Sequence, residues 1–364
     1  MSRVVAFKEL ISGQRRGPVA GLMRLLLWIA SFPYSWIVAW RNRQFDKSVG
    51  VQKAEVPVVS IGNLTTGGTG KTPLVSYICQ RLRNEHIRVA ILSRGYGSDQ
   101  GSVNDEALEL EFRLPDVPHL QDPDRKKIAD IAAEELASEI LVLDDGFQHR
   151  KLHREFDLLV IDATDPFGSG FVLPRGLLRE PIENLNRASF VVINRCNLVP
   201  AETVNSIKEK VRSISPEIEI AESATVSIES INYQGQTAPL AELKGKRVLA
   251  FCGIGNPSGF EKTLGELDIE LIEPIRVFPD HHQYSRNDIE EIRNWVRSSD
   301  HCQTVLCTHK DLVKINLGQF DGVPLKAILI GNRFLSGEES LWSLLRERTG
   351  LDKSAENRIN AGPT

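Results

Sequence analysis

The chain has 364 residues, which is enough for two domains with sizeable cores. Hydrophobic residues make up 41% and charged residues 25%, the balance of an ordinary soluble globular protein. A net charge of −4 gives no global sign of nucleic-acid binding, so no nucleic-acid partner is expected. The charge is uneven, however: residues 1–53 carry nine Lys or Arg against two acidic residues, which indicates a local anionic partner for this end of the chain.

The first element expected is apolar and rich in aromatic residues. Val19–Trp40 is 22 residues long, close to the roughly 20 needed to cross a bilayer, but Arg24 interrupts it and Pro33 is expected to break or kink a helix. Three tryptophans between basic flanks suit the headgroup layer, so residues 15–45 are predicted to form helices lying on a membrane surface. A spanning anchor and a buried helix pair are the alternatives.

From residue 56 the pattern changes to short apolar runs alternating with helical segments. Runs expected to be strands cover residues 56–62, 88–97, 139–146, 156–163 and 188–195, and helices are expected over 72–86 and 123–137. This alternation predicts an α/β fold with a parallel sheet. The five cysteines are scattered, odd in number and contain no C-x-x-C, so they are predicted to be reduced thiols of a cytosolic protein.

The first strand leads into the glycine-rich sequence GNLTTGGTGKTP. The strict phosphate-loop pattern is G-x-x-x-x-G-K-S/T, and this chain has Thr65 where the pattern has its first glycine. Its glycines allow backbone N–H groups to turn toward phosphate oxygens, its lysine carries a charge for the β- and γ-phosphates, and its last threonine suits Mg²⁺. The residues predicted to contact ATP here are Thr65, Thr66, Gly67, Gly68, Thr69, Gly70, Lys71 and Thr72.

A second motif, LVLDDGFQH, places acids directly after an apolar strand. Asp144 stands at the strand end, where a Walker B carboxylate holds Mg²⁺ or its water shell. Asp145 is a candidate for binding the metal or orienting an acceptor. Asp162, at the end of the next strand, is interpreted as a cap or turn residue.

Three further stretches carry weaker signals. In FPDHHQY, His281 and His282 adjoin Asp280; neighbouring histidines on a strand point opposite ways, so at most one faces a site, and a structural turn is as well supported as a general base. GIGNPSG at 253–259 does not match the dinucleotide fingerprint and predicts a tight turn. THKD at 308–311 is a poor match to the base-reading N-K-x-D of GTPases.

Together these motifs resemble one family, the lipid A biosynthesis tetraacyldisaccharide 4'-kinases. The matching strings are GNLTTGGTGKTP, SRGYG, NDE, DDGFQH, LPRGLLREP, GIGNP, FPDHHQY and THKD, in order from residue 62 to 311. The resemblance implies two α/β domains with the site between them. It also implies transfer of the ATP γ-phosphoryl group, with Mg²⁺, to the 4'-hydroxyl of an acylated glucosamine disaccharide 1-phosphate lipid, giving lipid IVA at the cytoplasmic face of the bacterial inner membrane, where the protein is peripheral or monotopic.

The resemblance also assigns roles to particular residues. The catalytic carboxylate falls on Asp105 and its partner on His281, a pair that takes the hydroxyl proton. Arg125 faces the phosphates of ATP. The metal set is Thr72, Asp144 and Glu180, and the substrate region holds Asp145, Arg179 and His282. Around Asp105 the chain reads N-D-E-A where the family usually reads G-D-E-P, so the local turn differs.

The expected fold is therefore α/β, with a P-loop NTPase-like parallel-sheet domain, a smaller α/β domain and an N-terminal membrane-associated helical segment. The predicted divisions are a basic, aromatic-rich helical segment at 1–50, a P-loop kinase core at 51–226, a linker or hairpin at 227–243, a second α/β domain closing the active site at 244–351, and a polar tail at 352–364.

The alternative function is a membrane-associated ATPase switch with a deviant Walker A loop. Such proteins need a lysine just before the double glycine, and this chain has Thr66 there.

Overall fold

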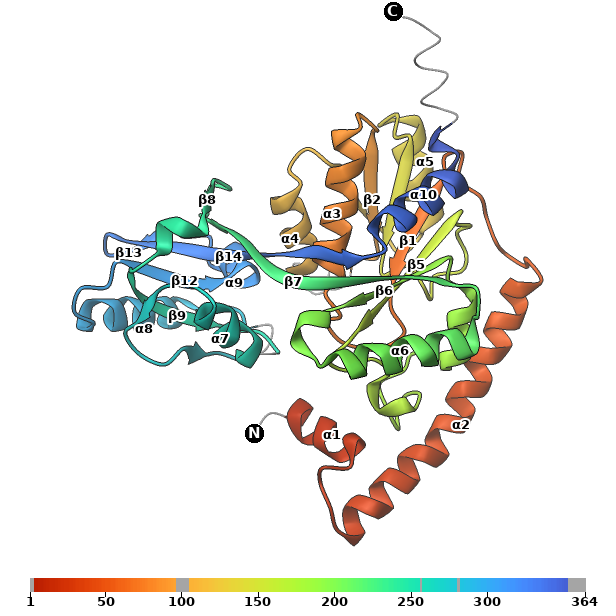
Figure 1. The fold of residues 1–364 in the computed structure, drawn as a ribbon, viewed down its shortest axis with the longest axis horizontal. Coiled ribbons are helices and arrows are strands. Elements are labelled where there is room, and N and C mark those ends of the chain that lie inside the picture. Colours follow the sequence, from red (N-terminus) through yellow and green to blue (C-terminus); the bar gives the residue numbers. More distant parts are fainter. Residues whose placement is uncertain (1–2, 96–104, 256, 280–281, 353–364) are drawn as a thin grey trace, which may run out of the picture. The chain divides into compact units, whose positions relative to one another are not determined.

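The computed structural model describes residues 3–95, 105–255, 257–279 and 282–352 (Figure 1). It divides the chain into two compact units, each discontinuous in sequence, whereas the sequence analysis drew each domain as one continuous stretch. Two of the points at which the chain passes from one unit to the other lie inside long strands, β7 (Glu219–Ile231) and β14 (Val323–Ser336). Unit 1 comprises Met1–Gly95, Asp116–Thr225 and Asn332–Thr364, and unit 2 comprises Tyr96–Pro115 and Val226–Gly331.

The sheet of unit 1 runs in the order β7-β6-β5-β1-β4-β2-β3, with every pairing among these strands parallel. Five of its strands are buried at every residue, which is why they appear in the sequence as unbroken apolar runs. The predicted α/β class with a parallel sheet is thereby confirmed. The remaining strands of unit 1 are β1 (Val58–Gly62), β2 (Val89–Ser93), β3 (His119–Gln121), β4 (Ile140–Asp144), β5 (Phe156–Asp162) and β6 (Phe190–Asn194).

Helices such as α3 and α6 lie beside the sheet of unit 1 (Figure 1). The side chains of α6 that pack on the sheet are apolar and lie about one helical turn apart. On α6, Val204, Ile207 and Val211 form a single core cluster with Val191 and Ile193 of β6. Full burial of each such side chain contributes roughly 1.5–3 kcal/mol, so this spacing fixes which face of the helix meets the sheet. The helices of unit 1 are α1 (Arg3–Ser12), α2 (Pro18–Asp46), α3 (Lys71–Asn84), α5 (Arg125–Glu134), α6 (Ala201–Ile214) and α10 (Glu338–Thr349).

Helix α2 differs from the sequence-based prediction because it continues through Pro33 as one helix of 29 residues. Proline removes one backbone donor and crowds the preceding turn. The helix continues because its inner face is packed on both sides of Pro33, through Ala20 and Ser31 before it and Val38 and Asn42 after it. Of the break or kink expected at Pro33, the break is therefore wrong.

In unit 2 the strand order is β10-β9-β12-β14, and the pairings of β9 with β10, of β9 with β12 and of β12 with β14 are all parallel. Residues of β9 alternate between two cores: Leu249 and Phe251 lie with α8, while Val248 and Ala250 lie with α7. Short antiparallel partners complete the sheet, β8 beside β7 and β13 beside β14. The other elements are α4 (Asp105–Arg113), β8 (Thr237–Pro239), β9 (Arg247–Cys252), α7 (Pro257–Gly265), β10 (Glu270–Leu271), β11 (Arg276–Val277), α8 (Arg286–Ser298), β12 (Thr304–Thr308), α9 (His309–Ile315) and β13 (Gln319–Phe320).

All five cysteines are free thiols, as the sequence predicted, and four of them are buried. Burial raises the pKa of Cys196 and of Cys252 to about 11, so both thiols are protonated at neutral pH. These cysteines are packing residues in the cores of their units.

Candidate active site

The predicted glycine loop connects β1 to α3, in the strand–loop–helix context that the motif requires. Gly67 has φ +123° and Gly70 has φ +77°, backbone conformations that side chains with a Cβ rarely adopt. Gly70 is the N-cap of α3 and no side chain caps the helix start, so the first-turn N–H groups of α3 are directed into the loop. Aligned N–H groups at a helix N-terminus form a phosphate-binding cradle.

The loop tolerates Thr65 at the missing glycine because its entry is held by another segment. Thr65 has no positive φ and forms an antiparallel bridge with Leu178. The next amide, of Thr66, donates to the carbonyl of Leu177 at 2.8 Å. A short ladder therefore shapes the loop entry, where a glycine otherwise gives conformational freedom.

Lys71 is fixed between the ends of two strands. Its Nζ lies 3.1 Å from Oδ1 of Asp145 and 3.2 Å from Oδ1 of Asn63, and only 10% of its side chain is exposed. Asn63 also donates through Nδ2 to Oγ1 of Thr69 at 3.2 Å, which ties the loop to the lysine. Asn63 is a site residue that the sequence analysis missed, although its place between strand and glycine loop was a usable signal.

The two acids after β4 meet the loop because β4 and β1 are parallel neighbours, with Asp144 opposite Ile61. Asp144 is buried, and its Oδ1 accepts the backbone N–H of Asp145 at 2.9 Å. Asp145 has φ +51° and lies between Lys71 and Arg179, whose Nη1 is 2.7 Å from Oδ2. Burial raises the pKa of Asp145, but the charges of Lys71 and Arg179 outweigh it and hold that pKa below its ordinary value, so the carboxylate is ionised.

Glu180 is fully buried and hydrogen-bonded on both oxygens. Oε1 accepts from Gln148 and Arg187, each at 3.0 Å. Oε2 accepts from Arg187 at 3.0 Å, Asn184 at 2.7 Å and Asn42 of α2 at 3.1 Å. Burial raises the pKa of Glu180, and these donors, led by Arg187, outweigh it and lower the pKa. The geometry makes Glu180 the centre of a hydrogen-bond network.

A positively charged group of side chains lies at the start of α5. Arg125, the first residue of that helix, is buried and donates to the carbonyl of Pro123 at 3.3 Å. Burial, followed by the charges of Arg125 and Arg154, lowers the pKa of His149 to about 4. His149 is therefore neutral at pH 7, with the charges of Arg125 and Arg154 nearby. It stands in the DDGFQH motif, but the sequence analysis did not single it out.

The donor set at the loop fits Mg²⁺ bound together with phosphates. The Thr72 side chain lies in the first turn of α3, and Asp144 ends the strand beside it. Within the described residues, no group of three or more His, Cys, Asp or Glu could hold a metal ion alone. Mg²⁺ normally takes one or two protein oxygens plus substrate phosphates and water, which is the set that Thr72 and Asp144 provide.

In unit 2, α4 begins at Asp105, so the predicted catalytic carboxylate belongs to the first residue of a helix. The other end of α4 is anchored: Glu109 pairs with Arg113 at 3.0 Å and lies 3.6 Å from Nδ1 of His309, and Arg113 donates to the carbonyl of Ile330 at 2.8 Å. Side chains of Asp105 and its neighbour lie outside the described residues.

Of the two adjacent histidines, His281 lies outside the described residues and His282 is engaged in packing. The His282 ring stacks on Phe278, with centroids 5.0 Å apart, and meets Tyr284 edge-on. Its Nε2 lies 3.2 Å from Oδ2 of Asp288. His282 is thus held by aromatic rings and a carboxylate at the start of α8.

The motif THKD has a structural role in unit 2. Asp311 is fully buried; its carboxylate accepts the N–H of Gly253 at 3.1 Å and the Tyr284 hydroxyl at 2.9 Å, and Thr308 donates to it at 2.5 Å. This carboxylate joins the GIGNP turn to α9 and has no capacity left to read a base. The low weight that the sequence analysis gave to base reading by THKD agrees with this geometry.

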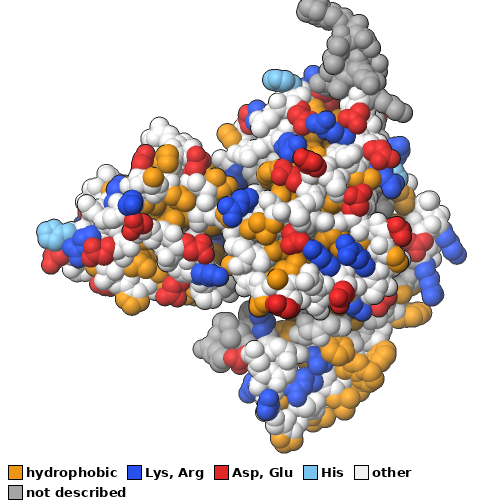
Figure 2. Space-filling model, in the orientation of Figure 1, with side chains coloured by type: hydrophobic (Ala, Val, Ile, Leu, Met, Phe, Trp, Pro, Cys, Tyr) orange, Lys and Arg blue, Asp and Glu red, His pale blue; other side chains and the backbone are white. Residues whose placement is uncertain are grey.

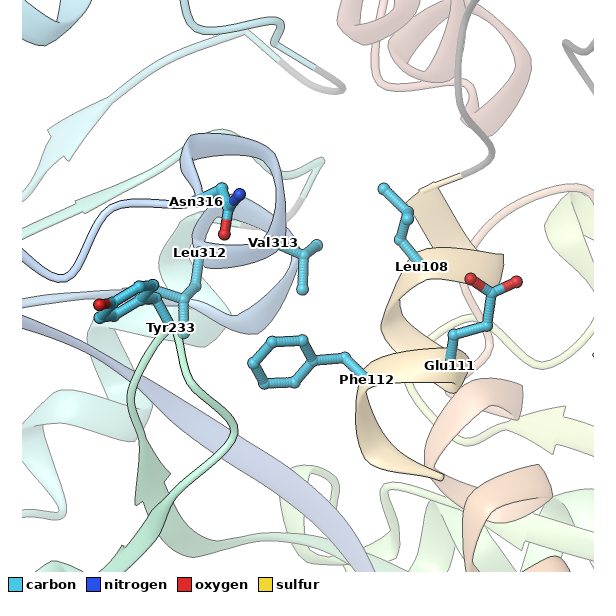
Figure 3. Close-up of a pocket in the computed structure, with 7 residues that line it drawn as sticks. All are labelled: Leu108, Glu111, Phe112, Tyr233, Leu312, Val313 and Asn316. Carbon is cyan, nitrogen blue, oxygen red and sulfur yellow. The ribbon is translucent and has the colours of Figure 1, made fainter. Parts of the chain in front are cut away.

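A pocket of about 360 Å³ opens in unit 2 between α4 and α9 (Figure 3). Leu108 and Phe112 of α4 and Leu312 and Val313 of α9 give it a mainly apolar lining. The residues predicted for the site are not among those that line it.

A glycine loop with its lysine clamped to a strand-end carboxylate, set on a parallel sheet, defines a P-loop nucleoside triphosphate-binding protein. The comparisons with known proteins narrow this class: the family model described as tetraacyldisaccharide-1-P 4'-kinase matches residues 23–349, and the chain belongs to that family.

Two curated relatives and one solved structure illustrate the similarity. The tetraacyldisaccharide 4'-kinase of Halothermothrix orenii is 34% identical over 339 residues, covering 84% of this chain and 88% of its own. That of Anaeromyxobacter dehalogenans (strain 2CP-1) is 35% identical and covers 91% and 92%. The crystal structure of LpxK from Aquifex aeolicus in complex with ATP has a TM-score of 0.72 and 30% identity, covering 90% of this chain and 99% of that one. The family and fold class expected from the sequence are confirmed.

Proposed function

We propose that this protein is a kinase that transfers the γ-phosphoryl group of ATP to the 4'-hydroxyl of an acylated glucosamine disaccharide 1-phosphate, forming lipid IVA. The observation that supports ATP binding is the position of Lys71, which is held by Asn63 and Asp145 at the end of the glycine loop. The acceptor follows from family membership and from the relatives that carry this name.

The proposal assigns a role to the residues of the glycine loop and to the charged residues around it. The backbone amides of the glycine loop and Lys71 bind the β- and γ-phosphates and stabilise the charge that develops between them. Thr72 and Asp144 hold Mg²⁺, which neutralises charge on the phosphoryl oxygens. Arg125 contributes a further positive charge to the phosphates. Asp145 and Arg179, paired at 2.7 Å, orient the acceptor side.

Asp105 and His281 form the proton-accepting pair of the proposal. The 4'-oxygen attacks the γ-phosphorus, its proton passes to this pair, and ADP leaves. We prefer His281 to His282 because the ring of His282 is already held by Phe278, Tyr284 and Asp288. Glu180 was predicted as a metal ligand; its donors on both oxygens favour a positioning role instead.

The membrane part of the proposal rests on α2, which is the described helix that is long and apolar enough to cross a membrane. One face of it, with Ala20, Ser31, Val38 and Asn42, is buried against the protein. The opposite face is a row of exposed apolar side chains, seen along the outer side of α2 in Figure 2. A helix docked along one face suits a peripheral or monotopic protein, and we place this face, flanked by basic residues from 15 to 45, on the cytoplasmic side of the bacterial inner membrane.

A transfer assay tests the function. Purified protein is given labelled ATP and Mg²⁺ with the disaccharide lipid, and label on the lipid is compared with phosphate released to water. We expect labelled lipid, a loss of roughly 100-fold or more in Lys71→Ala, and normal transfer in Lys210→Ala on an exposed position of α6. ATP hydrolysis without labelled lipid would instead support the ATPase switch.

A further inference from the structure

The end of β6 carries the sequence N-R-C-N, Asn194 to Asn197, which the assignments above have not used. β6 is the second strand from β1 in the order β6-β5-β1, and all three strands are parallel. Their carboxyl ends therefore lie at one edge of the sheet, where the phosphate loop begins. A residue that follows β6 is thus placed on the flank of the nucleotide site.

Asn194 fixes this end of β6 to the phosphate loop. The side chain is 1% exposed, and its Nδ2 donates to the carbonyl of Thr69 at 3.2 Å. Its Oδ1 accepts from the backbone N–H of Arg195 at 2.8 Å, from Oγ of Ser223 at 3.1 Å and from Nδ2 of Asn332 at 3.0 Å. A Cβ on Gly70 would lie 2.3 Å from Asn194 Nδ2, so the loop packs directly on this amide.

Arg195 follows in a left-handed conformation, φ +63° and ψ +29°, which is rare for a residue with a long side chain and is typical of functional sites. Its Nη1 forms an ion pair with Oδ2 of Asp162, at the end of β5. The other oxygen of Asp162 accepts from the backbone and hydroxyl of Thr164, so this carboxylate is fixed. The second guanidinium nitrogen, Nη2, lies 3.9 Å from the position of a Cβ on Gly70.

This arrangement holds the guanidinium by one edge and places it beside the loop that takes the phosphates. Only 23% of the Arg195 side chain is exposed. An Arg plane fixed by its edge offers a flat cationic face, and such faces stack on the rings of nucleobases. Asn197 does not read the base, because both of its amide atoms are bonded to the backbone of Thr225 at 3.1 Å.

We propose that Arg195 is the stacking platform for the purine base of the bound nucleoside triphosphate. The inference rests on the nucleotide part of the proposed function and extends it to the base. Stacking on a guanidinium plane uses the face of a purine, which adenine and guanine share. The platform therefore strengthens binding of ATP and GTP alike, and adds nothing to binding of a triphosphate without a base.

Binding measurements test the platform without any transfer reaction. Dissociation constants for ATP, GTP and inorganic triphosphate, each with Mg²⁺, are measured by calorimetry on the full chain. In Arg195→Ala we expect affinity for both nucleotides to fall about tenfold and affinity for inorganic triphosphate to stay unchanged. Arg212→Ala, at an exposed position of α6, should bind all three normally.

Arg195→Lys separates stacking from charge and protects the test against misfolding. Lysine keeps a positive charge next to Asp162 but has no planar group, so it should lose nucleotide affinity nearly as far as alanine does. Unchanged ATP binding in both variants, or an equal loss for inorganic triphosphate, would overturn the platform. If the wild-type protein bound no nucleotide, the proposed function itself would be wrong. If the wild type and both variants bound ATP equally well, only the role of Arg195 would be wrong.

Discussion

Substitution of Glu180 tests directly whether this side chain is a metal ligand or the centre of a structural hydrogen-bond network. In Glu180→Ala, Arg187 loses its carboxylate partner; its side chain is only 14% exposed, and its guanidinium also lies over the Phe147 ring at 4.6 Å. Removing one member of a buried ion pair costs about 3–5 kcal/mol, because the remaining charge is desolvated without compensation. Glu180→Gln keeps the shape and one acceptor, so its cost should be about 1.5–3 kcal/mol, the value of hydrogen bonds to a charged group.

The assay is denaturant unfolding at several pH values, followed separately for each transition because the chain has two units. Glu183→Gln, at an exposed position nearby, is the control and should be neutral. Burial raises the pKa of Glu180, but Arg187 and its other donors lower it below the ordinary carboxyl value. The ionised carboxylate therefore makes its full contribution to the free energy of unfolding at pH values above that ordinary pKa. The difference in unfolding free energy between wild type and Glu180→Gln should shrink as the pH falls through the folded-state pKa. Unchanged stability together with a raised Mg²⁺ requirement would refute this reasoning and make Glu180 a metal ligand.

Three other changes probe the remaining parts of the proposal. Asp105→Ala should lower lipid phosphorylation by roughly 100-fold or more while calorimetry still shows ATP binding; normal transfer would remove Asp105 from the chemistry. Ile29→Glu with Trp36→Glu, on the exposed face of α2, should weaken sedimentation with anionic vesicles about tenfold or more relative to Leu136→Glu, and equal sedimentation would place the contact elsewhere. Gly70→Ala should weaken ATP binding about tenfold beyond any effect of Gly245→Ala, since both glycines have φ near +70° but only Gly70 has Asn194 within reach of a Cβ.

The sequence predicted those parts of the site whose signal is local. The strand, glycine loop and helix around Lys71 are contiguous, and so are β4 and its two acids, so their order could be derived from residue spacing and confirmed in the fold. Thr65 shows the limit of prediction from local sequence. The loop accepts a threonine in place of the usual glycine because of contacts with Leu177 and Leu178, more than 100 residues away.

Long-range contacts also explain what sequence reasoning missed. Asn194 and Arg195 carry no spacing signal relative to the loop, and only the order of the parallel strands brings them beside Gly70. Pro33 is a strong local signal for a break, but packing of the inner face of α2 within unit 1 outweighs it. The hydrogen-bond network of Glu180 joins three separate segments of the chain, α2, the loop after β4 and the turn that follows Glu180, and no local pattern in one of them predicts the others.

Helix α2 joins the membrane part of the proposal to the site part. Its inner face holds the loop that carries Arg179 and Glu180: the Tyr34 hydroxyl donates to the carbonyl of Arg179 at 2.7 Å, and Asn42 donates to Glu180 at 3.1 Å. Its outer face carries the exposed apolar row. Deleting the helix would therefore disturb the acceptor loop and the membrane contact together, so a loss of activity on deletion could not be assigned to either. Charged substitutions confined to the outer face leave Tyr34 and Asn42 in place. If such variants lose vesicle binding but still phosphorylate detergent-solubilised lipid, membrane attachment and acceptor positioning are separate tasks of one helix.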